Sequence, residues 1–183
     1  MFTYRLDDES YLKLLDNDVL GELYRLIDSN RLHLRPWFPW VDEVRSEPDA
    51  RMFILAAKKQ YAENNGFRTA IMHRGELAGL AGYHEIDWVD RKTELGGWLG
   101  QSFEGSGLMT KTCRALVDHA FRQWRLHRVE ILCGTENPRS CAVPERLGFT
   151  KEGTMREAEC VNGTFSSHHV YGLLRREWMG EDA

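Results

Sequence analysis

A glycine-rich turn between a strand and a helix constrains the fold of this chain more than any other part of its sequence. The apolar run over residues 94–99 is typical of a strand, and the stretch that begins near Leu108 is typical of an amphipathic helix. Gly105 and Gly107 lie between them, where they let backbone N–H groups approach a ligand without an intervening Cβ. The pattern predicts either an anion site at a helix N-terminus or a purely structural tight turn.

The bulk composition limits the function classes. At 183 residues the chain suits a single domain over 1–183, and its net charge of −4 gives no general reason to expect nucleic-acid binding. No leader-like N-terminus and no apolar run of membrane-spanning length is visible, so we expect a cytoplasmic protein that does not bind membranes. The cysteines lack paired CxxC spacing, so we expect reduced, buried thiols and no metal site. They are Cys113, Cys133, Cys141 and Cys160.

Hydrophobic periodicity predicts an α/β chain in which helices and strands alternate irregularly. The last strand pair is joined by Asn162-Gly163, a strong hairpin signal, and the strand after the third helix is expected to be parallel to the strand before it. The predicted helices cover residues 19–30, 50–61, 113–124 and 139–147. The predicted strands cover 4–15 (two short strands), 69–73, 77–86, 93–99, 128–133, 150–160 and 164–174.

An aromatic segment separates the first two helices. Pro36 and Pro39 exclude a regular helix here, while Trp37, Phe38 and Trp40 cluster around them. Three interpretations stay open for these rings: a wall of an acceptor groove, core packing of at least one ring, or a contact in a homodimer.

A second motif supplies the family resemblance. Asn137-Pro138-Arg139-Ser140 follows the predicted parallel strand, and Leu147-Gly148-Phe149 ends the helix after it. Together with the glycine turn, this order resembles the GNAT superfamily of N-acetyltransferases over nearly the whole chain. The aromatic segment and Phe103-Glu104-Gly105-Ser106-Gly107 are similar to its RimJ/RimL-type ribosomal-protein branch, and within it to the YdaF-like group.

The resemblance implies a fold and a donor substrate. The fold is an α/β (α+β) acyl-CoA N-acyltransferase fold, with a mixed, mostly antiparallel seven-stranded sheet, a splayed central strand pair and about four flanking helices. The donor is acetyl-CoA, with no metal. Ser102 departs from the family's usual Gln or Arg, with Gln101 one place off, so phosphate contact would come from the backbone. The implied cofactor-binding residues are Trp98, Leu99, Glu104, Gly105, Ser106, Gly107, Leu108, Met109, Thr110 and Asn137.

Two side chains are candidates for the chemistry of amine acetylation. Glu94 suits a base that takes the ammonium proton or binds the cationic amine, or else an exposed strand residue paired with Arg91 or Lys92. Pro144 stands where many relatives carry a tyrosine acid, which makes Ser140 the better candidate to protonate the leaving thiolate.

Each of these residues has a structural alternative. Ser140 also suits a first-turn helix residue bonded to local backbone, and Asn137 also suits an ordinary helix cap. Tyr171 and Cys141 are weaker candidates because both residue types are usually buried filler. His168 and His169 are adjacent in a predicted strand, so they point to opposite faces and cannot share one metal.

The sequence therefore predicts an acetyl-CoA-dependent N-acetyltransferase that transfers the acetyl group directly to a primary amine. The expected acceptor is a protein N-terminus, such as that of a ribosomal protein, with Trp37, Trp40 and Glu94 on the acceptor side. The alternatives are a small-amine acetyltransferase or a non-catalytic acetyl-CoA sensor. A dinucleotide site is disfavoured because Thr110 replaces the third glycine of that motif.

Overall fold

The computed structural model describes residues 3–180 and contains two compact units. The first unit comprises the chain up to Gly82 together with Gly97–Thr112, and the second comprises Tyr83–Gly96 together with the chain from Cys113 onward. Two strands and one helix contribute residues to both units. The single domain expected over 1–183 stays a prediction.

The described residues form one eight-stranded mixed sheet and six α-helices, which confirms the predicted GNAT fold. The strand order is β1-β2-β3-β4-β5-β6-β8-β7, and β5 and β6 run parallel as predicted. The strands are β1 (Thr3–Arg5), β2 (Ser10–Leu14), β3 (Arg68–His73), β4 (Glu76–Asp87), β5 (Lys92–Leu99), β6 (Arg128–Gly134), β7 (Thr150–Val161) and β8 (Thr164–Leu174). The helices are α1 (Leu20–Ser29), α2 (Arg31–Leu34), α3 (Glu47–Ala62), α4 (Leu108–Arg122), α5 (Pro138–Arg146) and α6 (Arg175–Met179).

The counts exceed the expected seven strands and about four helices because very short elements join the longer ones. α2 has four residues and α6 has five, which is too short for the periodicity of a sequence to reveal them. β1, with three residues, is one of the two short strands predicted over 4–15, and it is the strand by which the sheet exceeds the seven that the resemblance implies. The two prolines of the aromatic segment do exclude an α-helix there. Pro39–Asp42 nevertheless closes one 3₁₀ turn, because Pro39 at its first position needs no N–H partner.

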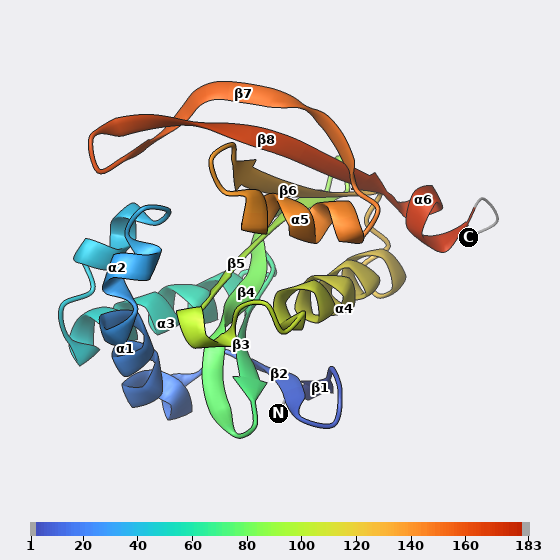
Figure 1. Cartoon of the computed structure of the whole chain (residues 1–183). Coiled ribbons are helices and arrows are strands. Elements are labelled where there is room, and N and C mark those ends of the chain that lie inside the picture. Colours follow the sequence, from blue (N-terminus) through green and yellow to red (C-terminus); the bar gives the residue numbers. More distant parts are fainter. Residues whose placement is uncertain (1–2, 181–183) are drawn as a thin grey trace. The chain divides into compact units, whose positions relative to one another are not determined.

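The first unit buries its core between helices and strands. α1 and α3 lie side by side (Figure 1), and Leu23, Ile27 and Ile54 from these helices are at most 1% exposed. Met72 on β3 and Leu80 on β4 belong to the same buried cluster. Each such side chain contributes about 1.5–3 kcal/mol to the stability of the fold on full burial. The cluster therefore holds α1 and α3 together, and these helices precede and follow the aromatic segment in the chain.

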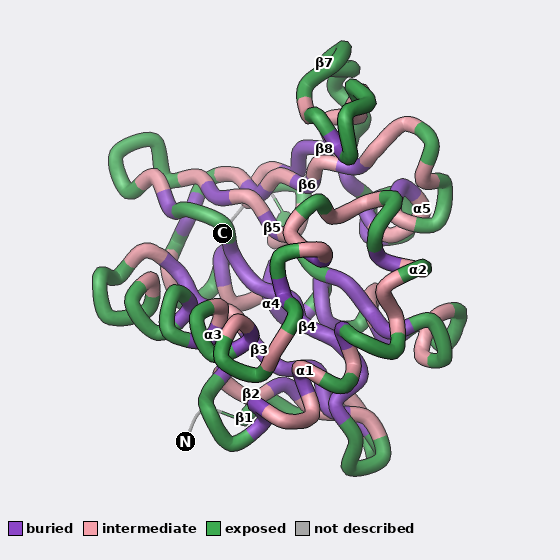
Figure 2. The backbone as a smooth tube through the Cα atoms, turned by 90° about the vertical axis from the view of Figure 1, so that its left-hand side faces the viewer, coloured by how far each residue is buried: buried purple, intermediate pink, exposed green. Residues whose placement is uncertain are grey.

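The second unit alternates buried and solvated residues along β6, where Val129, Ile131 and Cys133 point inward. The Asn162-Gly163 turn between β7 and β8 is confirmed, with positive φ of 52° and 83°. β7 is an edge strand of the sheet, and Figure 2 shows that it is exposed along most of its length.

One expectation about the cysteines is wrong. Cys113, Cys133 and Cys141 are free and buried, as predicted, but Cys160 is free and exposed. The reason is its strand: β7 is solvated along nearly its whole length, so a residue near its end finds no core to enter. Within residues 3–180, no helix is long and apolar enough to cross a membrane.

A buried hydroxyl provides a test of the packing in the second unit. The Tyr83 hydroxyl donates to the carbonyl oxygen of Leu116 in α4 at 2.7 Å, and the ring of Trp124 lies 4.6 Å from the Tyr83 ring. We expect Tyr83→Phe to lower the free energy of unfolding by about 1 kcal/mol, since the hydrogen bond is lost while the ring stays. Urea denaturation measures this, with the exposed Tyr61→Phe as a control that changes it by less than about 0.5 kcal/mol. Equal effects of the two variants would contradict the expectation.

Candidate active site

The glycine turn forms an open loop that leads from β5 into α4. We call residues 100–107 the donor loop. Gly105 and Gly107 both have φ of +76°, a conformation that favours glycine, and a Cβ built at either would meet nothing within 4 Å. Leu108, which is 2% exposed, anchors the start of α4 in the core. The loop therefore has both the backbone freedom and the open space that a phosphate cradle requires.

The donor loop is held by side-chain contacts within the first unit. The Ser106 hydroxyl donates to the carbonyl oxygen of Phe103 at 2.8 Å, and the carboxylate of Glu104 lies 3.0 Å from Nε2 of His33. The contact with His33 ties the Glu104 carboxylate, and with it this part of the donor loop, to α2. The first N–H groups of α4 have no intrahelical acceptor and add donors at the same place.

The aromatic segment packs against the strand that precedes the donor loop. We call residues 36–40 the aromatic loop. The Trp40 ring lies 6.0 Å from that of Trp98 and 5.7 Å from that of Phe53, and Phe38 lies 5.6 Å from Trp40. Core packing is therefore the interpretation that holds for Trp40 and Phe38. Trp37, Phe38 and Trp40 are all half-buried, whereas Trp98 and Leu99 are buried in the first unit.

Glu94 is half-buried in the second unit and does not pair with Arg91 or Lys92. Its Oε1 lies 3.8 Å from Nε2 of His84 on β4, whereas Lys92 pairs with Asp90 at 3.4 Å. Burial raises the pKa of Glu94 to about 7, and the negative charge of Glu130 adds to this rise. A carboxyl group with this pKa is able to gain and lose a proton near neutral pH, as a general base must.

The position of Glu94 in the sheet is distinctive. The parallel ladder of β5 and β6 has three residue pairs, Lys92 with Arg128, Thr93 with Val129 and Glu94 with Glu130, and it ends at the third. Arg128 donates to Glu130 at 2.7 Å and forms a second, two-pronged ion pair with Glu152. The negative charge of Glu130 disfavours a second negative charge on Glu94, its neighbour in the ladder.

Ser140 is directed at a sulfur atom. Its hydroxyl donates to Sγ of Cys133 at 3.3 Å, while its backbone N–H donates to Oδ1 of Asn137 at 3.1 Å. Asn137 is thus the N-cap of α5, one of the two roles expected of it. Burial raises the pKa of the Cys133 thiol to about 12, which keeps this sulfur neutral beside the serine.

The weaker candidates have local partners. The Tyr171 hydroxyl donates to Oε1 of Glu145 at 2.8 Å, and burial raises the pKa of this phenol. Cys141 contacts the carbonyl oxygen of Gly134 through its sulfur at 3.7 Å. Among the described residues, no group of three or more candidate ligands is arranged to hold a metal. His168 pairs with Glu159 at 3.2 Å, and His169 bonds the Thr154 hydroxyl at 2.9 Å.

Comparison with known proteins agrees with this geometry. The profile of the family described as Acetyltransferase (GNAT) domain matches residues 11–150. A Bacillus subtilis (strain 168) protein, "Putative ribosomal N-acetyltransferase YdaF", is 37% identical over 182 residues, which cover 99% of this chain and 100% of that protein. The chain belongs to the GNAT acetyltransferase family.

Further relatives define the activity of this GNAT protein. The ribosomal-protein-serine acetyltransferase of Escherichia coli (strain K12) is 27% identical over 172 residues, 94% of this chain and 96% of that protein. A solved structure of RimL, the ribosomal L7/L12 alpha-N-protein acetyltransferase in complex with coenzyme A, matches with a TM-score of 0.91 at 26% identity. It covers 94% of this chain and 98% of that chain. The protein is accordingly an acetyl-CoA-dependent N-acetyltransferase.

Three partners of the candidate residues in this GNAT protein were not predicted from the sequence. Glu130 lies two residues after the start of β6, and Glu94 lies two residues after the start of β5. The predicted parallel pairing of these strands could therefore have indicated that the two residues are neighbours. His84 reaches Glu94 from β4. His33 gave no signal, because nothing in the local sequence relates it to Glu104, which lies far along the chain.

The raised pKa of Glu94 predicts how stability depends on pH. Between pH 4.5 and about 7 the folded protein keeps a proton on Glu94 that the unfolded chain releases, so this residue lowers stability as pH rises through that window. We expect Glu94→Gln to raise the free energy of unfolding by about 1–3 kcal/mol at pH 8, and to change it little at pH 4. Urea denaturation at both pH values measures the difference. The exposed Glu85→Gln is the control, and a gain at pH 4 as large as at pH 8 would refute the assignment.

Proposed function

We propose that this GNAT protein acetylates the N-terminal α-amino group of a protein, and that its natural acceptor is a ribosomal protein. The proposal draws on the relatives, among which the ribosomal-protein-serine acetyltransferase and RimL are named for such acceptors. The single observation that carries its chemistry is Glu94, a half-buried carboxyl group whose pKa is raised to about 7 at the end of the parallel ladder.

Glu94 is proposed as the base. An amine attacks a thioester only when it has lost its ammonium proton, and α-amino groups have pKa values near 8 in solution. A carboxylate with a pKa near 7 takes that proton at small cost, directly or through a water molecule. An α-amino group also needs less help than the side chain of lysine, whose pKa is about 10.4, which favours N-termini over lysines as acceptors.

Ser140 is proposed as the acid. Direct transfer breaks the bond between the acetyl carbon and the CoA sulfur, and the departing thiolate needs a hydrogen-bond donor. The Ser140 hydroxyl already donates to one sulfur, that of Cys133. At the capped start of α5, the Ser140 hydroxyl can rotate about its Cβ–Oγ bond, and we propose that it donates to the departing thiolate in this way.

The donor loop is proposed to hold the pyrophosphate of acetyl-CoA with backbone N–H groups over residues 104–110. Acetyl-CoA, when bound, supplies the activated acetyl group. Trp98 and Leu99 lie on the strand that leads into this loop, and Asn137 supports Ser140 by capping its helix. Trp37 and Trp40 are proposed to line the acceptor side, with Trp40 in a supporting role because one side of it packs against the core.

An acceptor panel tests the function. The purified protein with acetyl-CoA should acetylate α-amino groups of peptides that match ribosomal-protein N-termini, and purified ribosomal proteins, with a kcat/KM at least about tenfold higher than for lysine side chains or spermidine. Mass spectrometry of the products locates the acetyl group. Acetylation of spermidine alone would instead support the small-amine alternative. Tight acetyl-CoA binding without any transfer would support the sensor alternative.

Two substitutions test the residue roles. We expect Glu94→Gln to lower kcat about 100-fold and Ser140→Ala about 10–100-fold, because each removes one proton-transfer group. The dissociation constant for acetyl-CoA should change less than about twofold in both. For the unmodified protein, kcat/KM should rise with pH up to about 7 as Glu94 ionises, and Glu94→Gln should lose this step. Unchanged turnover in both variants would exclude the two assignments.

A further inference from the structure

We propose that three residues at the junction of α1 and α2, Asn30, Arg31 and His33, form a positioning element that fixes the donor loop and the aromatic loop together. We call these residues the corner. The inference rests on the proposed roles of the two loops in donor and acceptor binding. All of its contacts lie within the first unit.

Asn30 and His33 hold the donor loop at two points. The amide oxygen of Asn30 accepts from the backbone N–H of Gln101 at 2.8 Å, and its amide nitrogen donates to the carbonyl oxygen of Leu26 at 2.8 Å. His33 pairs with Glu104 at 3.0 Å, three residues after the first contact. The side chain of Asn30 is thus fixed from α1, and it fixes in turn the backbone at which the donor loop begins.

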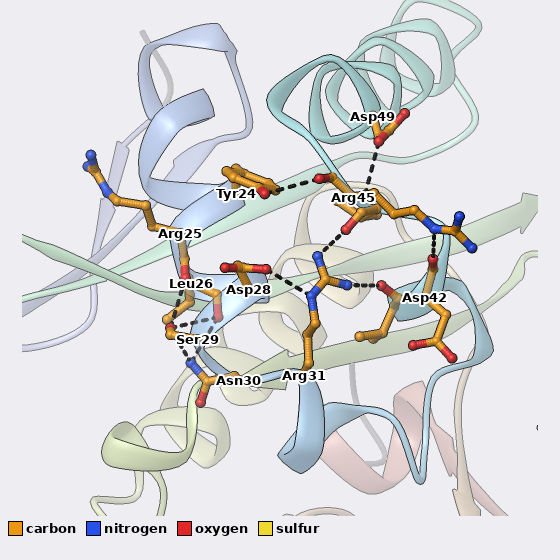
Figure 3. Close-up of polar contacts among 12 residues, drawn as sticks. Tyr24, Arg25, Leu26, Asp28, Ser29, Asn30, Arg31, Asp42, Arg45 and Asp49 are labelled. Carbon is orange, nitrogen blue, oxygen red and sulfur yellow. Dashed lines mark hydrogen bonds and ion pairs between the residues drawn. The ribbon is translucent and has the colours of Figure 1, made fainter.

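Arg31 holds the segment that follows the aromatic loop. Its guanidinium donates to the carbonyl oxygen of Val41 at 2.6 Å and to that of Val44, and Nε contacts Asp28 at 2.9 Å. Figure 3 shows this guanidinium between Asp28 and the turn that carries Asp42 and Arg45. One rigid, planar donor thus binds a carbonyl group of the 3₁₀ turn and one of the loop after it, which fixes the separation of the two.

Neighbouring bonds close the same turn around Arg31. Arg45 donates from Nε to the carbonyl oxygen of Asp42 at 2.9 Å, and Tyr24 donates its hydroxyl to the carbonyl oxygen of Arg45 at 3.1 Å. The Asp42 carboxylate pairs with Arg35 at 2.9 Å, across the aromatic loop. The backbone on both sides of that loop is therefore tied to α1 and α2.

The corner joins the two loops through adjacent residues of one short helix and its cap. Asn30 is the N-cap residue of α2, and Arg31 and His33 lie within its single turn. A shift of α2 would move the donor loop and the aromatic loop at once. The structure thus assigns to α2 the alignment of both binding segments.

Substitutions of Asn30 and Arg31 test separately the contact to the donor loop and the contacts to the segment after the aromatic loop. We expect Asn30→Ala to weaken CoA binding about tenfold by calorimetry and to speed backbone amide hydrogen exchange over residues 100–107. We expect Arg31→Gln to raise the acceptor KM about tenfold and to speed exchange over residues 36–45, with the CoA dissociation constant changed less than about twofold. Arg31→Lys should not restore the acceptor KM, because one ammonium group cannot hold both carbonyls in the same geometry.

A double-mutant cycle tests the third contact. His33→Gln should weaken CoA binding about threefold to tenfold in the otherwise unmodified protein, and should have almost no effect when Glu104 is already glutamine. Arg25→Gln is the matched control, since Arg25 is exposed on α1 and its side chain points away from the corner in Figure 3. It should change neither hydrogen exchange nor either binding constant.

The outcomes distinguish this inference from the proposed function. If the unmodified protein acetylates no N-terminus, hydrogen exchange and CoA binding still test the corner. If it does acetylate N-termini but Asn30→Ala and Arg31→Gln leave exchange in both loops unchanged, the corner is overturned and the function stands. Equal loss of melting temperature in the corner variants with unchanged loop exchange would likewise overturn it, since that result shows a structural role only.

Discussion

The parallel ladder between β5 and β6 has only three residue pairs, and the chemistry proposed for this protein depends on where it stops. Up to the third pair, the backbone groups of the two strands satisfy each other. Beyond it, Leu95 and Gly96 continue β5 with no further residue pair to β6. Two carboxyl groups, Glu94 and Glu130, belong to this last pair, and their repulsion adds to the burial that makes Glu94 difficult to ionise.

The neighbours of the two carboxyl groups account for the proton on Glu94. Glu130 receives a short, charge-assisted hydrogen bond from Arg128, and Arg128 is itself fixed by Glu152. Glu94 has His84 at the longer distance of 3.8 Å. The pKa of Glu94 is therefore raised first by burial and then by the charge of Glu130, and no described residue as close to Glu94 as Arg128 is to Glu130 offsets that rise.

The elements of the fold were largely predictable from the sequence, because most of them have amphipathic patterns. The buried stripe of α1 and the alternation of β6 are visible in the order of residues, as is the Asn162-Gly163 turn. The short helix α2 was not predictable, because four residues contain little more than one period. The candidate residues were visible as motifs, but their environment was not. The pKa of Glu94, the sulfur partner of Ser140 and the contact between His33 and Glu104 all depend on residues that the fold brings together from separate parts of the chain.

The distribution of the cysteines has a practical consequence for following the reaction. Three thiols are enclosed in the interior, whereas Cys160 is open to solvent. A colorimetric reagent that detects liberated coenzyme A through its thiol would also react with Cys160, giving a background of one equivalent per chain before any turnover. Single-turnover measurements with such a reagent would therefore need a Cys160→Ser protein. The same accessibility makes Cys160 a natural attachment point for a fluorophore on β7.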